Sequence, residues 1–252
     1  MSAVQKSEVE AAFAAEVAGN IAGMRGDPDL MALSRMWARA VGAHRYAYNF
    51  SWMGRPMIQV PQDVVAMQEL IFRVRPQAIV ETGVAHGGSL IFHASMLELL
   101  GTDGLAIGID VEVRPHNRAA IDEHPLRHRI RIVEGSSVDP ATVERVWRAV
   151  ASRSPVLLAL DSNHTHDHVL SELRAYSGLI GRGSYIVVYD TLIEDLPASF
   201  SDGRPWGPGN SPKTAVRQFL AENRRFEVDA DIDAKLLITV APGGWLRCVE
   251  DP

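Results

Sequence analysis

The spacing of apolar residues predicts helices in the first part of the chain. Apolar positions recur every three or four residues over 4–22, 29–41 and 62–74, as they do on the buried stripe of an amphipathic helix. Gly26-Asp27-Pro28 interrupts the first two stretches, and its aspartate and proline are typical of a helix start. Residues 49–61 are aromatic and follow no period, so we expect an irregular segment that packs over the mouth of a site.

From residue 78 onward, short β-branched apolar runs alternate with helical stretches. Such alternation favours a mainly parallel sheet with helices on both faces. Strands are expected at 78–82, 105–110, 130–134, 156–161 and 185–190. Most of these runs end at an acid, and ligands bind at the carboxyl edge of open α/β sheets.

The C-terminal part shows two further patterns. The apolar runs 235–240 and 245–249 are joined by Ala-Pro-Gly-Gly, which is too short for a parallel crossover and predicts an antiparallel hairpin at the sheet edge. Residues 192–212 are rich in Gly, Pro and Ser, so we expect a long irregular loop, and loops of this length are often lids. A helix over 213–223 follows it.

Composition narrows the class of protein. The chain has 252 residues, enough for one large domain with a small appendage. A formal net charge of -6 without a Lys/Arg block argues against nucleic-acid binding, which depends on phosphate neutralisation. No apolar run is long enough to span a membrane, and no secretory signal is visible. With Cys248 as the single cysteine, these features predict a cytoplasmic protein.

The first strand breaks into a glycine-rich turn that predicts a nucleotide-cofactor site. Gly83, Gly87 and Gly88 remove side chains where backbone must approach a ligand, and a helix then begins at Ser89. Backbone N–H groups at a helix start suit an anion. Asp110 closes the next strand, where an acid commonly holds ribose hydroxyls.

The segment that follows the fourth strand, Asp161-Ser-Asn-His-Thr-His-Asp-His168, is rich in side chains that bind metals or move protons. Asp161 and Asp190 end neighbouring strands, so both carboxylates are placed to meet one hard cation such as Mg2+. Of the histidines, His164 is nearest the strand end and is the candidate general base. His166 and His168 are expected on the solvated first turn of a helix.

These motifs together resemble the cephalosporin hydroxylase/rhamnosyl O-methyltransferase family. The resemblance runs from about Asn49 to Arg247 and is carried by Phe50-Ser-Trp-Met-Gly-Arg-Pro56, Gln59-Val-Pro-Gln-Asp63, Glu81-Thr-Gly, His86-Gly-Gly-Ser89, Gly108-Ile-Asp110, Gly135-Ser-Ser137, Leu160-Asp-Ser-Asn-His-Thr165 and Asp190-Thr191. It implies a class I methyltransferase sheet, S-adenosylmethionine at the first strand's carboxyl end, often a divalent metal, and O-methylation of sugars or natural products. We therefore expect an N-terminal helical and irregular cap at 1–61 and a Rossmann-like, S-adenosylmethionine-binding methyltransferase domain at 62–252.

With S-adenosylmethionine as the cofactor, the motif residues receive individual roles. Glu81 would pair with the ammonium end, Asp110 with the ribose diol, and Ser136 or Ser137 with the adenine. The backbone of the glycine loop would meet the aminocarboxylate. The full set of expected cofactor contacts is Glu81, Thr82, Gly83, Gly87, Gly88, Ser89, Asp110, Ser136 and Ser137.

The metal site departs from the family pattern at one position. The metal-binding members carry an acid directly before the second aspartate, where this chain has Tyr189. Asp161 and Asp190 remain as metal ligands, with Asn163 as a further oxygen donor. Without a metal, the two aspartates would orient a base or hydrogen-bond the substrate.

The acceptor is expected beneath the loop at 192–212. Trp206 would offer a flat apolar face to a sugar or ring, and Trp52 and Arg55 are further candidates for the acceptor wall. The family favours a small-molecule or glycan acceptor with a sugar hydroxyl, and it also makes a homo-oligomer an expectation.

Three other functions stay open on the sequence alone. His164-Thr-His-Asp167 has the residue types of the two-histidine, one-carboxylate site of non-haem iron oxygenases. A nicotinamide dehydrogenase also uses a glycine loop and an acid, but the G-x-G-x-x-G spacing is absent and Asp110 comes later than the usual interval of about 20 residues. A non-catalytic binding protein is the third alternative.

Overall fold

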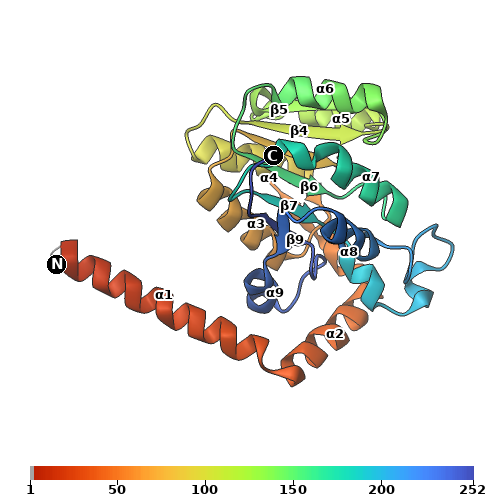
Figure 1. Ribbon diagram of the computed structural model, residues 1–252. Coiled ribbons are helices and arrows are strands. Elements are labelled where there is room, and N and C mark those ends of the chain that lie inside the picture. Colours follow the sequence, from red (N-terminus) through yellow and green to blue (C-terminus); the bar gives the residue numbers. More distant parts are fainter. Residues whose placement is uncertain (1–2) are drawn as a thin grey trace.

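The computed structural model describes residues 3–252, with side-chain burial from residue 7 onward. Its centre is a seven-stranded sheet with the order β5-β4-β3-β6-β7-β9-β8 and helices on both faces (Figure 1). Residues 1–2 of the expected N-terminal cap lie outside the described residues. The strands are β3 (Ala78–Thr82), β4 (Leu105–Asp110), β5 (Ile130–Glu134), β6 (Val156–Leu160), β7 (Tyr185–Val188), β8 (Phe226–Val228) and β9 (Trp245–Cys248).

The five strands from β3 to β7 are parallel, as the sequence predicted. Thr82 of β3 pairs with Ile109 on one side and with Leu160 on the other, so the carboxyl ends of these strands share one edge. The chain order reverses at β3, since β4 lies on one side and β6 on the other. Loops diverge at such a switch point and leave a crevice for a ligand.

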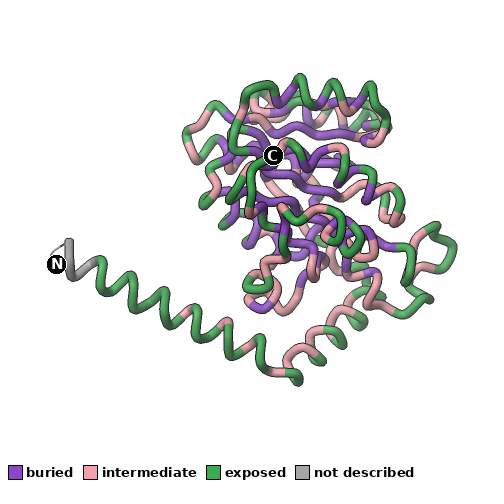
Figure 2. Tube along the Cα trace, in the orientation of Figure 1, coloured by how far each residue is buried: buried purple, intermediate pink, exposed green. Residues whose placement is uncertain are grey.

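Two hydrophobic cores hold the helices to the sheet. One core joins the sheet to α3 (Pro61–Val74), α4 (Gly88–Leu99) and α5 (Pro115–Asp122). The other joins it to α6 (Pro140–Val150), α7 (His166–Tyr176) and α8 (Pro212–Glu222) on the opposite face. Figure 2 shows the central strands buried between the layers, which explains why their sequences are apolar without alternation.

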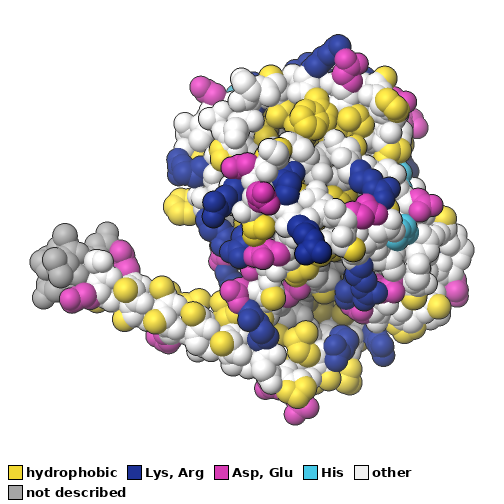
Figure 3. Space-filling view, in the orientation of Figure 1, with side chains coloured by type: hydrophobic (Ala, Val, Ile, Leu, Met, Phe, Trp, Pro, Cys, Tyr) yellow, Lys and Arg dark blue, Asp and Glu magenta, His cyan; other side chains and the backbone are white. Residues whose placement is uncertain are grey.

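The N-terminal helices lie outside this sandwich. α1 (Ala3–Arg25) extends away from the sheet, and α2 (Pro28–Gly42) returns toward it (Figure 1). Asp27 caps α2 by accepting hydrogen bonds from the N–H groups of Asp29 and Leu30, as the breaker motif predicted. Hydrophobic side chains follow α1 on the face shown in Figure 3, and Phe13 is 65% exposed. Among the described residues, none of the helices combines the length and apolarity needed to cross a bilayer.

Residues 49–61 are more regular than the sequence suggested. They contain a two-stranded antiparallel ribbon of β1 (Phe50–Trp52) and β2 (Arg55–Met57). Met53 and Gly54 have φ of 43° and 82°, so both turn residues adopt the left-handed conformation that a tight two-residue hairpin needs. Single-turn helices complete the fold at η1 (Tyr46–Asn49), η2 (Arg127–Arg129), η3 (Ser177–Leu179), η4 (Thr191–Asp195) and η5 (Ala198–Ser201).

The expected hairpin of 235–240 with 245–249 is wrong in its first strand. Residues up to Leu236 belong to α9 (Ala230–Leu236), whose start is capped by the Asp229 side chain. The N–H of Val240 donates to the buried Asp63 carboxylate at 2.9 Å rather than to a strand. β9 instead pairs antiparallel with β8 and with β7, so the antiparallel edge is present with a different partner.

We expect the α8 side of the sandwich to depend on Phe219. This side chain is 1% exposed and its ring centroid lies 5.4 Å from that of Phe226. Phe219→Ala should lower the free energy of unfolding by about 3–5 kcal/mol in urea titrations. Phe72→Ala removes the same group from a 64% exposed position and should change it by less than about 0.5 kcal/mol. Similar losses in both variants would contradict the assignment of the core.

Candidate active site

Three cavities open at the carboxyl edge of the sheet. The largest, about 630 Å³, extends from Asp110 and Gly135 to the ends of β6 and β7, and we call it the nucleoside cavity. A second, about 300 Å³, lies between the glycine loop and the segment after β2, and we call it the loop cavity. The third, about 480 Å³, lies beyond β7 against α2, and we call it the outer cavity. Tyr48 and Asp190 line all three.

Close backbone packing requires glycine at two positions of the loop. A Cβ on Gly83, where φ is +90°, would lie 2.0 Å from the carbonyl oxygen of Asp161. A Cβ on Gly88 would lie 2.2 Å from the carbonyl oxygen of Pro56. Gly87, with φ of 81°, is the N-cap of α4, whose first turn presents backbone N–H groups that lack intrahelical partners. The loop is therefore fixed between β6 and β2 with a helix start at the loop cavity.

Asp110 clamps the same loop from the neighbouring strand. One oxygen of its carboxylate accepts hydrogen bonds from the N–H groups of Val84 at 2.9 Å and Ala85 at 3.2 Å. The other oxygen accepts from the N–H of Glu112 at 3.2 Å. Asp110 also lines the nucleoside cavity, so one carboxylate both shapes the loop and faces the space expected for a ribose.

Glu81 and Thr82 lie below the loop rather than on the cavities. Glu81 is 2% exposed, accepts a hydrogen bond from the Ser89 hydroxyl, and lies 3.5 Å from Nδ1 of His93. The carbonyl oxygen of the fully buried Thr82 accepts from the N–H of Asp161 at 3.0 Å. Direct cofactor contacts by these two side chains, as the sequence suggested, do not fit this placement. Glu81 supports the loop through Ser89, which reaches the loop cavity, and Thr82 holds the end of β3 to Asp161.

The two serines after β5 take different positions. Ser137 lines the nucleoside cavity although it is only 5% exposed. Ser136 does not line that cavity, and its carbonyl oxygen accepts the N–H of Asp139 in the turn before α6. The geometry therefore favours Ser137 of the two residues proposed to meet an adenine.

An acidic centre forms where β6 and β7 end. Both strands stop before the acids, at Leu160 and Val188, which leaves Asp161 and Asp190 on the loops at their ends. Ligand atoms of Asp161, His164 and Asp190 lie within 4.8 Å of one another. Nε2 of His164 is 3.3 Å from Asp190 Oδ2. The sequence prediction that these three residues converge is consistent with this geometry.

Burial and neighbouring carboxylates disfavour the negative charge of Asp161 in the acidic centre. Burial raises the pKa of Asp161 well above its usual value, and the charges of Asp190 and Glu81 raise it further. The side-chain amide of Gln59 donates to Asp161 Oδ2 at 3.0 Å and offsets only part of this. The two carboxylates beside one another suit a divalent cation, which would compensate the charge, and the His164 imidazole lies within reach of the same point.

Tyr189 lies beside this centre without adding charge to it. The side chain is 6% exposed, and burial together with the carboxylates of Asp63, Asp161 and Glu81 raises its pKa well above the usual value. The phenol therefore stays neutral where the resemblance led us to expect a third acid. The donor set for a metal is smaller than in the family pattern but remains oxygen-rich.

Trp206 connects the nucleoside and outer cavities. Its ring lies edge-on to the His164 ring with centroids 5.5 Å apart, and it lines both cavities. The outer cavity is largely apolar, and Asp190 lies at one end of it. Its apolar lining includes Trp37, Val41, Tyr46, Leu192, Leu196 and Phe200. The loop at 192–212 supplies part of this lining, through short helical turns rather than regular secondary structure.

Trp52 and Arg55, expected on the acceptor wall, lie elsewhere. Trp52 packs edge-on against Phe92 with centroids 4.9 Å apart and donates from Nε1 to the Ser95 hydroxyl at 3.0 Å. The Arg55 guanidinium donates to the carbonyl oxygen of His86 at 2.7 Å, so it holds the glycine loop. Because the ribbon folds back onto α4, its long side chains are used for packing.

The histidines of the segment after β6 do not form an iron site. His166 points to α8, where its ring nitrogens lie 2.8 Å from the Thr214 hydroxyl and 3.0 Å from Gln218 Oε1. It is absent from the metal-capable group around His164, as is Asp167. The two-histidine, one-carboxylate arrangement, which the sequence had left open as an alternative, is therefore not built by this segment.

Comparison with known proteins identifies the family. The family model described as Rhamnosyl O-methyltransferase/CmcI matches residues 44–249. The chain belongs to this family. It is therefore a member of a group of S-adenosylmethionine-dependent O-methyltransferases, as the sequence motifs indicated.

Relatives of this rhamnosyl O-methyltransferase/CmcI family member cover most of its length. A rhamnosyl O-methyltransferase of Mycobacterium bovis (strain BCG / Pasteur 1173P2) is 29% identical over 212 residues, which span 81% of this chain and 82% of that protein. A rhamnosyl O-methyltransferase of Mycobacterium leprae is 26% identical over 211 residues, covering 81% of this chain and 87% of that protein.

Solved structures show the same fold. A structure of CmcI with Mg and SAM has a TM-score of 0.56 and 20% identity, covering 80% of this chain and 77% of that one. A cofactor-bound structure of Rv0187 from MTB has a TM-score of 0.53 and 18% identity, and the match covers 90% of this chain and 92% of that one. Both likenesses concern the sheet and its helices.

Several residues of the site were given no role from the sequence. Gln59 and Asp63 belong to the family motif Gln59-Val-Pro-Gln-Asp63, and this motif was the signal in the sequence that could have pointed to them. The structure places Gln59 on Asp161 and buries Asp63 completely next to the acidic centre. Tyr48 lies just before the region of resemblance, and nothing in its local pattern indicated that it lines three cavities.

The buried carboxyl group of Asp63 predicts a distinct pH dependence of stability. Burial raises its pKa from 3.8 to about 7, and the charges of Asp190 and Asp233 add to the rise. A raised pKa means that its contribution to stability is complete below about pH 4 and is lost as the pH rises through about 7. The free energy of unfolding should therefore be compared between the wild type and Asp63→Asn at each pH. The difference, wild type minus variant, should fall by up to about 4 kcal/mol as the pH rises from about 4 to above 7.

Urea titrations from pH 4 to pH 8 would measure this difference. Asp167→Asn, at an exposed position on the first turn of α7, is the matched control and should follow the wild-type profile. Parallel profiles for the wild type and Asp63→Asn would contradict the assignment.

Proposed function

We propose that this protein transfers the methyl group of S-adenosylmethionine to a hydroxyl group of a sugar, glycan or natural product, with help from a divalent cation such as Mg2+. The observation that carries the proposal is the meeting of Asp161, His164 and Asp190 where the nucleoside and loop cavities join. The rhamnosyl O-methyltransferases among its relatives support a sugar hydroxyl as the acceptor.

The cavities fit the two ends of S-adenosylmethionine. The nucleoside cavity offers Asp110 to a ribose diol and Ser137 to the adenine side. The loop cavity offers Gly83, Gly88 and Ser89 at the start of α4, where N–H groups and the helix dipole suit the aminocarboxylate. When bound, S-adenosylmethionine supplies an electrophilic methyl group. The protein aligns the acceptor oxygen behind that methyl group, because the transfer is an in-line displacement.

Asp161 and Asp190 are the proposed ligands of the cation. Mg2+ prefers oxygen ligands, which leaves His164 free for proton transfer. A bound cation lowers the pKa of an acceptor hydroxyl and fixes its orientation. The raised pKa of Asp161 supports this assignment, because burial and the neighbouring carboxylates disfavour its negative charge, which a bound cation would offset.

His164 is the proposed general base. With one ring nitrogen directed to Asp190 at 3.3 Å, its other nitrogen is available to accept the hydroxyl proton. The Trp206 ring packs against the imidazole and limits its movement. Asp190 thereby orients the base in addition to its role at the cation.

The outer cavity is the proposed acceptor site. It ends at Asp190 and is lined by the loop at 192–212 together with α2 and η1. We therefore propose that residues 1–61 act as a cap over the methyltransferase domain at 62–252, with Trp37 and Tyr46 on the acceptor. Self-association remains a proposal from the family resemblance, and exposed side chains of α1 such as Phe13 provide a surface for it.

Substitution of the acidic centre should separate cation binding from proton transfer. With p-nitrophenyl rhamnoside as acceptor and Mg2+ present, Asp161→Asn should lower kcat at least 100-fold and also weaken Mg2+ binding in calorimetry. His164→Ala should lower kcat by a similar factor with Mg2+ affinity nearly unchanged. Asp167→Asn is the control at an exposed position and should leave both quantities near wild type. Methylation by Asp161→Asn at the wild-type rate would overturn the proposed centre.

Trp206 should matter for the acceptor and little for the cofactor. Trp206→Ala removes an aromatic wall of the outer cavity, so the KM for the aryl rhamnoside should rise about tenfold or more. The Kd for S-adenosylhomocysteine should change by less than about threefold. Trp147→Ala, on the 39% exposed face of α6, should change neither. An equal loss of acceptor and cofactor affinity in Trp206→Ala would contradict the role of this loop.

A further inference from the structure

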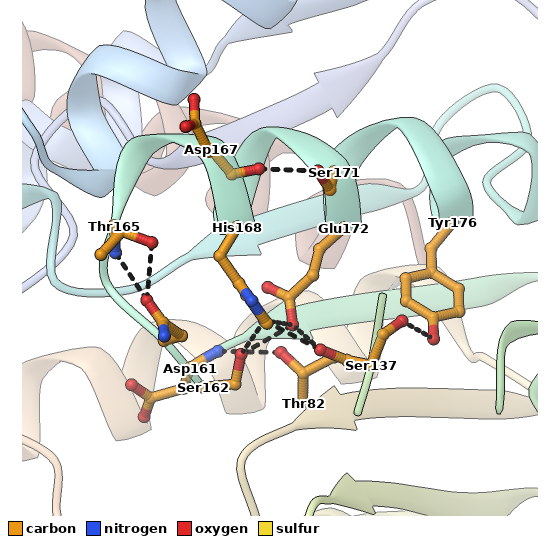
Figure 4. Close-up of polar contacts among 11 residues, drawn as sticks. Thr82, Ser137, Asp161, Ser162, Thr165, Asp167, His168, Ser171, Glu172 and Tyr176 are labelled. Atoms are coloured by element: carbon orange, nitrogen blue, oxygen red, sulfur yellow. Dashed lines mark hydrogen bonds and ion pairs between the residues drawn. The ribbon is translucent and has the colours of Figure 1, made fainter. Parts of the chain in front are cut away.

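A buried polar stripe on α7 faces the nucleoside cavity. His168, Glu172 and Tyr176 are spaced four residues apart, so they share one face of the helix. Figure 4 shows this face directed toward Ser137 after β5 and Ser162 after β6. The sequence had suggested a solvated first turn for His168, but its side chain is only 19% exposed.

Glu172 is the centre of this stripe. It is 0% exposed, and its Oε1 accepts hydrogen bonds from the hydroxyl groups of Ser137 at 2.5 Å and Ser162 at 2.7 Å. The Tyr176 hydroxyl donates to the carbonyl oxygen of Ser137 at 2.6 Å and fixes the same loop. A buried carboxylate is costly unless donors surround it, so these contacts need a reason beyond packing.

The hydroxyl groups determine which nitrogen of His168 carries a proton. Each serine hydroxyl has one proton, and both protons are directed to Glu172. The ring nitrogen Nε2 lies 3.0 Å from the Ser137 oxygen, 3.3 Å from the Ser162 oxygen and 3.3 Å from Glu172 Oε1. All three neighbours are acceptors toward it, so Nε2 is the protonated nitrogen.

The other ring nitrogen of a neutral His168 is then a hydrogen-bond acceptor. None of the described residues hydrogen-bonds its Nδ1, because every contact of the ring is made through Nε2. The side chain lines the nucleoside cavity together with Asp110, Gly135 and Ser137. We propose that His168 recognises the adenine ring of the cofactor, with Nδ1 accepting a hydrogen bond from the exocyclic amine and Glu172 fixing the tautomer that makes this possible.

The proposal rests on S-adenosylmethionine as the cofactor and adds that the protein selects adenine over other nucleobases. Adenine presents an amine donor at this position, whereas hypoxanthine presents a carbonyl oxygen. A carbonyl opposite the Nδ1 lone pair leaves two acceptors facing each other without a proton between them. The protein should therefore discriminate between adenosyl and inosyl forms of the same ligand.

Calorimetric titration with S-adenosylhomocysteine and S-inosylhomocysteine tests the proposal directly. The wild type should bind the adenosyl compound about tenfold more tightly or better, equivalent to one hydrogen bond of about 1.4 kcal/mol. His168→Ala should reduce this preference to less than about threefold. Glu172→Gln should also reduce it, because an amide can donate to Nε2 and permit the opposite tautomer. His166→Ala, which removes the α7 histidine that contacts α8, should keep the wild-type preference.

Each outcome has a defined meaning. Equal affinity of the wild type for both compounds, or an equal loss of affinity for both in His168→Ala with the preference retained, would overturn the role of His168 and leave the methyltransferase proposal standing. Failure of the wild type to bind S-adenosylhomocysteine would overturn both proposals. Nitrogen-15 NMR of the histidine rings provides a second readout, in which His168 should appear as the Nε2–H tautomer in the wild type. An Nδ1–H tautomer would contradict the inference regardless of how the variants fold.

Discussion

The site depends on one backbone contact, the approach of the glycine loop to the end of β6. Gly83 packs so closely on the carbonyl of Asp161 that a Cβ would lie 2.0 Å from that oxygen. This contact places the loop proposed to receive the cofactor's charged end directly beside the residue proposed to hold the cation. Arg55, through the His86 carbonyl, and Asp110, through the loop N–H groups, secure the loop from its other sides. In the proposed reaction, these contacts would help to align the methyl donor with the acceptor.

The fold also concentrates carboxylates at this junction. Asp63 and Glu81 are buried, Asp161 lines two of the cavities, and Asp190 adds its charge to that of Asp63 and of Asp161. A buried carboxylate is expensive unless donors surround it, and the protein provides hydrogen bonds from the Gln59 amide to Asp161 and from the Val240 N–H to Asp63. At the proposed metal site, a bound cation would offset this negative charge in addition to any chemical role.

The sequence predicted the parts of the fold that depend on local pattern. The five parallel strands were recognisable because burial on both faces requires continuous apolar runs, and their common direction placed Asp161 and Asp190 together. The C-terminal hairpin was wrong because an apolar run such as 235–240 does not reveal that Asp63, far away in the sequence, captures the Val240 N–H. Trp52 and Arg55 were misplaced for the same reason, since contacts across the ribbon and α4 are not visible in spacing.

The α7 stripe shows how the two halves of the site are linked. Ser162 follows Asp161 directly, and Ser137 belongs to the loop after β5, yet both hydroxyl groups end on the same oxygen of Glu172. A shift of the loop at the adenine side therefore cannot occur without disturbing a hydrogen bond next to the acidic centre. Because one buried carboxylate is shared, its placement on α7 ties the proposed nucleoside site to the proposed cation ligands. The helix that covers the sheet on this side thus acts as part of the site, through its buried face.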